Sequence, residues 1–472
     1  MATTPKSPAL ALVALCAIPV FVSLSKAQPA RPDVVAFVHA AVVPMDRERV
    51  VQDQTVVVAN GKIVAIGPST TVAVPAQALR IDARGRYLLP ALSDMHVHLL
   101  GESWNAMFPP KDRLARGDIP FESFLFPYIA KGITTVQVLM ATPEDLAVRE
   151  QVRRGEIIGP RMILARMIDG PEKAWPPPLN TWVATAVEAR AAVLRAKADG
   201  YDKIKVYSFL NQESYDAVIA TAGELKMEVM GHVPMSLSVE YVLKNGQKAI
   251  AHSEEVAKHT AGYDPERVDY YAKLVAGSGA WMIPTLVTTH NFLDLFDDPD
   301  GVFKRPGAEY FRHPMQRGAW TFMVDNLYRP IPPDHRAKLR EAYVKFQRPL
   351  TKAIHDKGGR LLAGSDALMP GLVAGFSLHG ELHEFVDVGL TPFQALKTAT
   401  TSPFEYLGES DKAGTIEIGK QSDLLLLDDN PLVTVSAASK IEGVLMRGRW
   451  ITAAEIDKRM QAIAALGSAP TR

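Results

Sequence analysis

The chain has 472 residues, with 52 Lys and Arg against 52 Asp and Glu, 47% hydrophobic and 8% aromatic residues, and one cysteine. This composition excludes disordered, collagen-like and disulfide-scaffold proteins. The zero formal charge argues against nucleic acid as a partner, because phosphate binding needs a cationic surface. One cysteine excludes an internal disulfide and a CxxC zinc site, so a metal would have to rest on His, Asp, Glu or a less usual ligand.

Residues 1–27 are typical of a secretory signal peptide. Lys6 precedes an apolar stretch over 9–24, and Ser25-Lys26-Ala27 is a small-x-small tripeptide that fits cleavage after Ala27. Cleavage would remove the only cysteine, Cys16, and two lysines, which leaves a slight acidic excess. We therefore expect a secreted or periplasmic protein.

Two alternatives to a cleaved signal remain for this segment. An uncleaved anchor helix is one, but Pro19 interrupts the apolar run, which is also shorter than the roughly 20 residues of a membrane span. A lipoprotein signal is the other, and the bulky Leu15 before Cys16 fits it poorly. No other hydrophobic stretch is long enough to span a bilayer, so the sequence predicts no stable membrane insertion.

Both ends of the remaining chain are rich in short β-like runs. Between Val34 and Leu89 such runs flank Asn60-Gly61, which is the strongest short-range signal for a hairpin. Similar runs return over 415–446. The two ends predict one small, discontinuous β-sandwich domain made of residues 28–89 and 409–460.

Residues 90–408 alternate short apolar runs with amphipathic helices. The expected strands are 93–98, 133–139, 161–166, 202–207, 227–232, 248–252, 281–285 and 360–364. Eight strands that alternate with helices are typical of a (β/α)8 TIM barrel, so the predicted fold class is α/β. A Rossmann-type sheet is the alternative, but no GxGxxG motif follows the first strand.

A long connection, residues 286–359, separates the last two expected strands. It is far longer than a usual loop and is rich in aromatic, proline and charged residues. At the catalytic end of a barrel such a segment is typical of a lid or a substrate wall. A helical insertion that only packs is the alternative.

Polar side chains stand at the ends of five expected barrel strands. They are His96 and His98 on the first strand, Lys205 on the fourth, His232 on the fifth, His252 on the sixth and Asp366 on the eighth. Each alone is weak evidence for a metal site, and a satisfied polar group at a strand end is the ordinary alternative. Because catalytic residues of barrels lie at the carboxyl ends of the strands, one cluster can collect the whole ordered set.

This set resembles that of the amidohydrolase superfamily. The barrels of that superfamily have HxH on strand one, a carboxylated lysine on strand four, histidines on strands five and six, and an aspartate on strand eight. Residues 88–94, 132–136 and 414–423 are similar to family sequences as well, and the resemblance spans almost all of 34–450. One departure is Ala91-Leu92-Ser93-Asp94, where the family usually has Gly-Leu-Ile-Asp.

The resemblance implies a centre with two divalent metal ions. The implied ligands are His96, His98 and Asp366 for one ion, His232 and His252 for the other, and a carboxylated Lys205 that bridges the two. Zinc fits imidazole and carboxylate ligands, with Mn²⁺, Co²⁺ and Fe²⁺ as alternatives. Two metals that share a water lower its pKa towards neutrality, so that the resulting hydroxide attacks a polarised carbonyl.

Two residues have expected catalytic roles at this centre. Asp366 would take the proton of the attacking water and pass it to the leaving amine, as general base and then acid. Tyr207 follows Lys205 by two residues on the same face of the strand, and it would hydrogen-bond the developing oxyanion or a substrate carboxylate. A tyrosine that only packs in the barrel is the alternative for Tyr207.

Segments 204–207, 231–234 and 375–382 are most similar to the imidazolonepropionase-related branch, which includes prolidase-like dipeptidases. This similarity implies a hydrolase that cleaves an amide C–N bond in a small-molecule substrate, a dipeptide or an N-acyl amino acid. A lactonase, phosphotriesterase or cyclic-amide hydrolase is the first alternative, and a secreted metal-binding protein without turnover is the second. The fold alone does not determine the substrate. The sequence is also compatible with a homo-oligomer.

Overall fold

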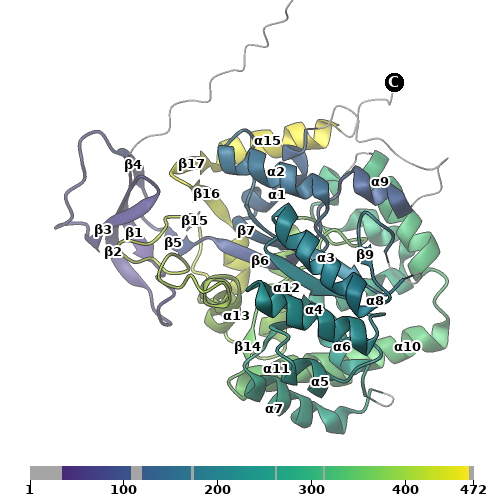
Figure 1. Ribbon diagram of the computed structural model, residues 1–472. Helices are drawn as coiled ribbons and strands as arrows, with labels where there is room; N and C mark the ends of the chain where they lie inside the picture. The colour runs from purple at the N-terminus through teal and green to yellow at the C-terminus, as the bar shows by residue number, and fades with distance from the viewer. Residues whose placement is uncertain (1–33, 108–119, 172–174, 261–262, 312–313, 467–472) are drawn as a thin grey trace, which may run out of the picture. The chain divides into compact units, whose positions relative to one another are not determined.

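The computed structural model describes residues 34–107, 120–171, 175–260, 263–311 and 314–466 (Figure 1). The predicted signal peptide, residues 1–27, lies outside the described residues and stays a prediction. Within the described ranges, no helix is both long enough and apolar enough to cross a membrane.

Strands from both ends of the described chain share one sheet. From the N-terminal part come β1 (Val34–Val42), β2 (Val51–Ala59), β3 (Lys62–Pro68), β4 (Leu79–Asp82) and β5 (Tyr87–Pro90), and from the C-terminal part β15 (Leu424–Leu427), β16 (Ile441–Met446) and β17 (Arg449–Thr452). The hydrogen-bonded order is β17-β16-β15-β5-β1-β2-β3, with β4 beside β1. The antiparallel β5–β15 pair therefore joins segments far apart in sequence.

The predicted hairpin forms at Asn60-Gly61, between β2 and β3. Both residues have positive φ angles, 50° and 72°. A two-residue turn with positive φ at both positions matches the right-handed twist of the strands it connects, which explains why Asn-Gly occurs there.

A second sheet is parallel and follows chain order. Its main path consists of β6 (Leu92–Val97), β7 (Ile133–Val138), β8 (Arg161–Asp169), β10 (Lys203–Val206), β11 (Glu228–Gly231), β12 (Ala249–Ala251), β13 (Trp281–Ile283) and β14 (Arg360–Leu361), and β9 (Thr181–Trp182) pairs with β8. Every residue of β6 and β7 is buried, as expected for strands covered on both faces. The arrangement is an α/β fold consistent with a TIM-like barrel.

Backbone contacts also link the first strand to the segment that follows the last one. Met95 N donates to Ala363 O at 2.9 Å, and Val97 forms a parallel bridge with Ala367. β14 itself covers only two residues of the predicted 360–364, because this segment turns from β13 towards β6. Residues 363–367 therefore bring the eighth strand end beside the first.

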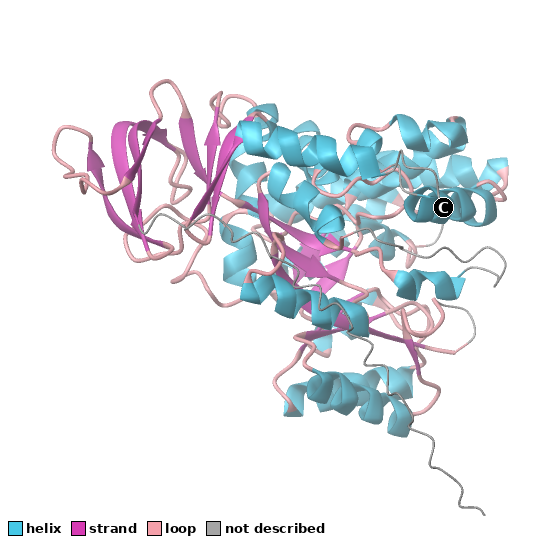
Figure 2. Cartoon of the chain, turned by 90° about the horizontal axis from the view of Figure 1, so that it is seen from above, coloured by secondary structure: helices cyan, strands magenta, loops and turns pink. Residues whose placement is uncertain are grey.

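Helices lie outside the parallel strands (Figure 2). Around the barrel strands and at the C-terminus they are η1 (Glu102–Met107), α1 (Glu122–Ala130), α2 (Pro143–Arg154), α3 (Ala186–Asp199), α4 (Gln212–Glu224), α5 (Val239–Lys244), α6 (Ser253–Ala257), η3 (Pro265–Arg267), α7 (Val268–Ser278), α12 (Phe376–Asp387), α13 (Pro392–Ala399), α14 (Thr401–Tyr406), η8 (Val435–Ser439) and α15 (Ala453–Leu466). Thr142 and Asp145 form a capping box at the start of α2. Local sequence thus fixes where this helix begins.

The described part of the long connection 286–359 is mainly helical. It contains α8 (Leu286–Asp297), η4 (Pro299–Lys304), η5 (Ala308–Tyr310), α9 (Pro314–Met323), η6 (Val324–Tyr328), α10 (Pro333–Ala342), η7 (Tyr343–Gln347) and α11 (Arg348–Asp356). Its side chains Leu293, Trp320 and Phe346 are buried in the main hydrophobic core. The connection is therefore an integral part of the folded unit.

Phe346→Ala is expected to lower the free energy of unfolding by about 3–5 kcal/mol, because it leaves a cavity where a fully buried ring stood. Val344→Ala, two residues away and 57% exposed, is the matched control and should change stability little. Urea denaturation of both variants measures the difference. Equal stabilities would show that the connection packs loosely.

Candidate metal centre

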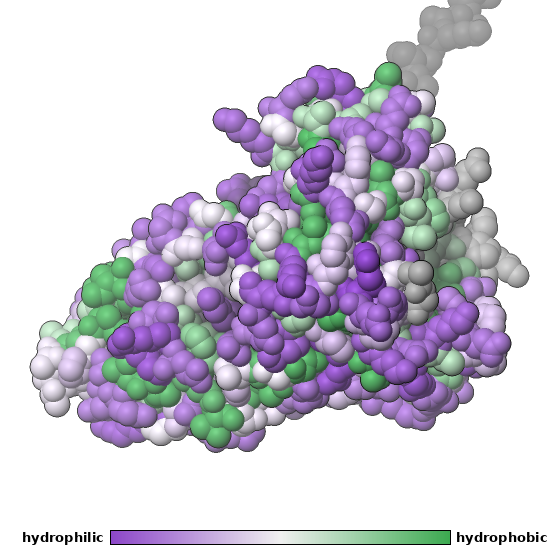
Figure 3. Space-filling model, turned by 90° about the horizontal axis from the view of Figure 1, so that it is seen from below, coloured by the Kyte–Doolittle hydropathy of each residue, from purple (hydrophilic) through white to green (hydrophobic). Residues whose placement is uncertain are grey.

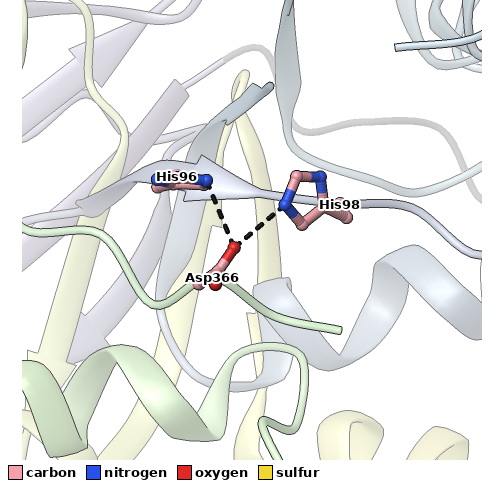
Figure 4. Close-up of side chains that lie close together, drawn as sticks. All are labelled: His96, His98 and Asp366. Atoms are coloured by element: carbon pink, nitrogen blue, oxygen red, sulfur yellow. Dashed lines mark hydrogen bonds and ion pairs between the residues drawn. The ribbon is translucent and has the colours of Figure 1, made fainter. Parts of the chain in front are cut away.

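Three of the predicted ligands meet at the seam between the first and last barrel strands (Figure 4). His96 lies in β6, His98 follows it, and Asp366 follows β14. Asp366 Oδ1 is 2.9 Å from His98 Nε2 and 3.2 Å from His96 Nε2. One ligand atom from each of the three buried side chains lies within 4.8 Å of the others, which is a spacing that a metal ion can bridge.

The residues around this triad explain why the two chain segments come so close. A Cβ on Gly364 would lie 2.7 Å from the Cβ of His96, so only glycine permits the approach. Asp94 accepts hydrogen bonds from Ser365 N at 3.0 Å and from Ser365 Oγ at 2.5 Å. Asp94 is fully buried, and this burial raises its pKa to about 7 despite those hydrogen bonds.

Two of the predicted ligands adopt strained backbone conformations. Asp366 has φ 53° and His252 has φ 70°, in the left-handed region that non-glycine residues avoid. Such conformations cost on the order of 1–3 kcal/mol each and are concentrated at functional sites. The backbone of Asp366 is held there by a hydrogen bond from its N–H to His96 O at 2.7 Å.

His232 and His252 lie beside the triad. The ring centroid of His252 is 4.6 Å from that of His96 and 5.0 Å from that of His232. His252 Nδ1 is 2.7 Å from Thr285 Oγ1, and His232 Nδ1 is 2.9 Å from Ser208 Oγ. In both rings a hydroxyl group contacts Nδ1. Such a contact fixes the orientation of the ring, so that Nε2 is available to a metal ion, as in known metal sites.

The side chain of Lys205, in β10, is buried in the parallel sheet between the neighbouring strands β8 and β11. A Cβ on Gly231 in the next strand would lie 2.9 Å from Lys205 Cγ, and the φ of Gly231 is 132°. Burial lowers the pKa of Lys205 to about 8. Because a buried ammonium is costly without a full set of partners, the interior disfavours the charged form of Lys205 relative to water.

Burial sets the charge of the imidazoles. Desolvation lowers the pKa of His96 to about 3 and also lowers the pKa values of His98, His232 and His252. Burial opposes ionisation of Asp366, but its interactions with His96 and His98 hold the pKa of that carboxyl well below its usual range. Neutral imidazoles and an ionised carboxylate are the forms that bind metals.

Tyr207, which was expected to have a catalytic role, lies beside His232. Its ring centroid is 3.9 Å from that of His232, and its hydroxyl accepts a hydrogen bond from Trp175 Nε1 at 3.2 Å. Burial raises the pKa of Tyr207, so the phenol stays protonated. A protonated phenol can donate a hydrogen bond to an anionic oxygen.

Sequence reasoning missed Glu255, a buried partner of His232. Glu255 Oε1 is 3.0 Å from His232 Nδ1 and 2.8 Å from Lys258 Nζ. Burial opposes its ionisation, but His232 and Lys258 hold the pKa of the carboxyl well below its usual range. The only sequence signal was an acidic residue three positions after His252, on α6, and nothing local connects it with His232.

The sequence profile described as "Amidohydrolase family" matches residues 87–451. The chain belongs to the amidohydrolase family. This family consists of hydrolases, and the matched region contains all six predicted ligand positions. A comparison with curated protein sequences found no match.

Several solved structures have a fold similar to that of this chain. A Bifidobacterium longum protein provisionally assigned as a prolidase has 22% identity and a TM-score of 0.68, with 93% of this chain and 100% of that one covered. A Xaa-Pro dipeptidase with bound methionine has 21% identity and a TM-score of 0.68, over 89% and 100%. Bottromycin amidohydrolase has 22% identity and a TM-score of 0.69, over 93% and 91%.

Glu255→Gln is expected to weaken metal binding by about 10- to 100-fold, because a neutral amide orients and polarises His232 less well than a carboxylate does. Glu254→Gln is the matched control, since Glu254 also pairs with Lys258, at 3.2 Å, and the structure shows no contact of its side chain with His232. Competition with a chromogenic zinc chelator measures both affinities. Equal affinities in the two variants would exclude the orienting role of Glu255.

Proposed function

We propose that this amidohydrolase is a metal-dependent enzyme with two divalent ions that cleaves the amide C–N bond of a dipeptide or an N-acyl amino acid. The observation that carries the proposal is the meeting of His96, His98 and Asp366 at one buried point, with His232 and His252 beside it. Unrelated polar residues at strand ends would each find a separate partner.

Unsatisfied nitrogen atoms of the site support the proposal of two metal ions. His232 Nε2 and His98 Nδ1 are buried and have no hydrogen-bond partner within the described ranges of the chain, which is costly unless another ligand satisfies them. His96, His98 and Asp366 would hold one ion, His232 and His252 the other, and Lys205, carboxylated by CO₂, would bridge them. Imidazole and carboxylate donors suit zinc. When bound, the ions would supply Lewis acidity and lower the pKa of a water molecule.

The protein's own residues would perform the proton transfers. The Asp366 carboxylate would accept a proton from water as the water oxygen bonds to the amide carbon, and it would return that proton to the amide nitrogen as the C–N bond breaks. The products are a carboxylic acid and an amine. The protonated phenol of Tyr207 would donate a hydrogen bond to the oxyanion that develops on the amide oxygen.

Amide cleavage is favoured over ester or phosphotriester cleavage by the similar structures. A dipeptidase and an amidohydrolase are among them. Hydrolysis assays with amides, esters and phosphotriesters distinguish these bonds.

Chelation of the native protein is expected to abolish hydrolysis of dipeptides and N-acyl amino acids, and added Zn²⁺ or Mn²⁺ should restore it. Asp366→Asn should lower kcat by about 100-fold or more through loss of the proton-transfer group. Asp411→Asn, at an exposed position, is the control. Rates are measured by release of the free amine, with metal content determined in parallel.

Three outcomes would contradict this proposal. Hydrolysis that survives chelation would exclude a metal-dependent mechanism. Turnover of lactones or phosphotriesters alone would assign a different bond. A protein that holds metal and turns over no amide, ester or phosphotriester would be a metal-binding protein.

The proposal includes export, on the strength of the sequence of residues 1–27. Expression of the full chain in a bacterial host should place the protein outside the cytoplasm, with Gln28 as the first residue after removal of the signal peptide. Fractionation and N-terminal sequencing check this. A cytoplasmic product that retains Met1 would exclude cleavage.

A further inference from the structure

A continuous set of aromatic rings runs along one side of the candidate centre. The ring centroid of Trp104 is 6.3 Å from that of His98 and 5.8 Å from that of Trp175. Trp175 donates to the hydroxyl of Tyr207, whose ring lies at an angle of 34° to that of His232, with 3.9 Å between the ring centroids. We call Trp104, Trp175 and Tyr207 the aromatic wall. It spans from a ligand of the first strand to a ligand of the fifth.

Three large apolar side chains are exposed at the ends of the neighbouring strands. Trp182, in β9, is 39% exposed, Phe209, after β10, is 43% exposed, and Met235, after β11, is 56% exposed. We call these three residues the apolar rim. They follow strands β8, β10 and β11 at their carboxyl ends, where barrel active sites lie.

One hydrogen bond ties the apolar rim to the aromatic wall, and two others fix the backbone of the rim residues. Trp182 Nε1 donates to Trp175 O at 3.1 Å, and Met235 N donates to Ser208 O at 2.9 Å. Phe209 N donates to Asp169 Oδ1 at 2.6 Å. Single exposed apolar residues are common on protein surfaces, and Figure 3 shows such patches among polar side chains on one face of the molecule. The apolar rim differs because Trp182 is hydrogen-bonded to Trp175, a partly buried residue of the aromatic wall.

Two lysines lie near the aromatic wall. Lys205 Nζ is 5.2 Å from the ring centroid of Tyr207, and the carboxylation proposed above would remove its positive charge. Lys258, whose charge acts on Tyr207, is already paired, because its ammonium lies 2.8 Å from Glu255 and 3.2 Å from Glu254. A substrate carboxylate at this place would compete with two protein carboxylates for one ammonium. Affinity on this side of the site therefore comes from apolar contact.

We infer that the substrate is an aromatic amide, whose ring is held between the aromatic wall and the apolar rim. The inference rests on the proposed amide hydrolysis and names its substrate class. Aromatic rings pack edge-on or offset on other rings. Trp175 and Tyr207 are only partly buried and present such surfaces, while Trp104 is 1% exposed and packs against Trp175. Burial of a phenyl group corresponds to about 10- to 100-fold in binding.

Two matched pairs of amides test the inference with the metal-loaded native protein. N-acetyl-phenylalanine against N-acetyl-alanine places the ring on the amine side, and benzoyl-glycine against acetyl-glycine places it on the acyl side. The aromatic member of at least one pair should have a kcat/KM about 10- to 100-fold higher. Equal values in both pairs would overturn the inference.

Variants test which residues cause the preference for aromatic substrates. Trp175→Ala should raise KM for the preferred aromatic substrate about tenfold with a smaller change in kcat, and it should reduce the aromatic preference. Phe209→Ser, a change at an exposed position that should fold normally, is expected to act in the same direction with a smaller effect. Ile418→Ser is the control, because Ile418 is 63% exposed and belongs to the C-terminal segment. An aromatic preference that is unchanged in both Trp175→Ala and Phe209→Ser would overturn the assignment.

A binding measurement separates this inference from the proposed function. If none of the four amides is hydrolysed, amide hydrolysis fails, and isothermal titration with the same unhydrolysed compounds still tests the ring-binding surface. Saturable binding of an aromatic member, lost in Trp175→Ala, supports the inference. Equal or absent binding of all four compounds overturns it.

Discussion

Backbone hydrogen bonds between β6 and residues 363–367 bring the first and last strands of the parallel sheet together, and the candidate centre depends on this contact. Gly364 has no side chain to hold the two segments apart. Asp94 accepts two hydrogen bonds from Ser365 and so fixes the segment that leads to Asp366. The carboxylate of Asp366 then reaches both His96 and His98, although about 270 residues separate them in the chain.

The same close packing determines the chemistry of the site. Burial keeps the imidazoles neutral and makes every unpaired nitrogen costly. Hydroxyl and carboxylate partners from neighbouring elements, Ser208, Thr285 and Glu255, engage the Nδ1 atoms of His232 and His252. Each ring is thus held in one orientation before any ligand binds, which reduces the cost of forming the site. Strained backbone angles at His252 and Asp366 indicate that the fold, rather than local preference, places these residues.

Much of the fold was predictable because its signals are local. The expected strand 133–139 corresponds to β7 (Ile133–Val138), and the Asn60-Gly61 hairpin forms as expected. The Thr142–Asp145 capping box is a local signal of the same kind. The start of α10 is local as well: the helix begins at Pro333, with Pro332 as its cap residue. Proline suits the first helical position because its φ is fixed near the helical value and it has no N–H to leave unpaired.

The sequence by itself determined the residue types at the strand ends and the order of the strands, since apolar periodicity and strand-end polar residues are properties of neighbours in the chain. It also contained the family resemblance that the family match supports. Only the tertiary structure decided that Glu255 contacts His232, that Trp175 contacts Tyr207, and that an apolar rim adjoins the aromatic wall. These contacts join residues 7 to 32 positions apart or on different strands, and distances between such residues are set by how the elements pack, which no local pattern encodes.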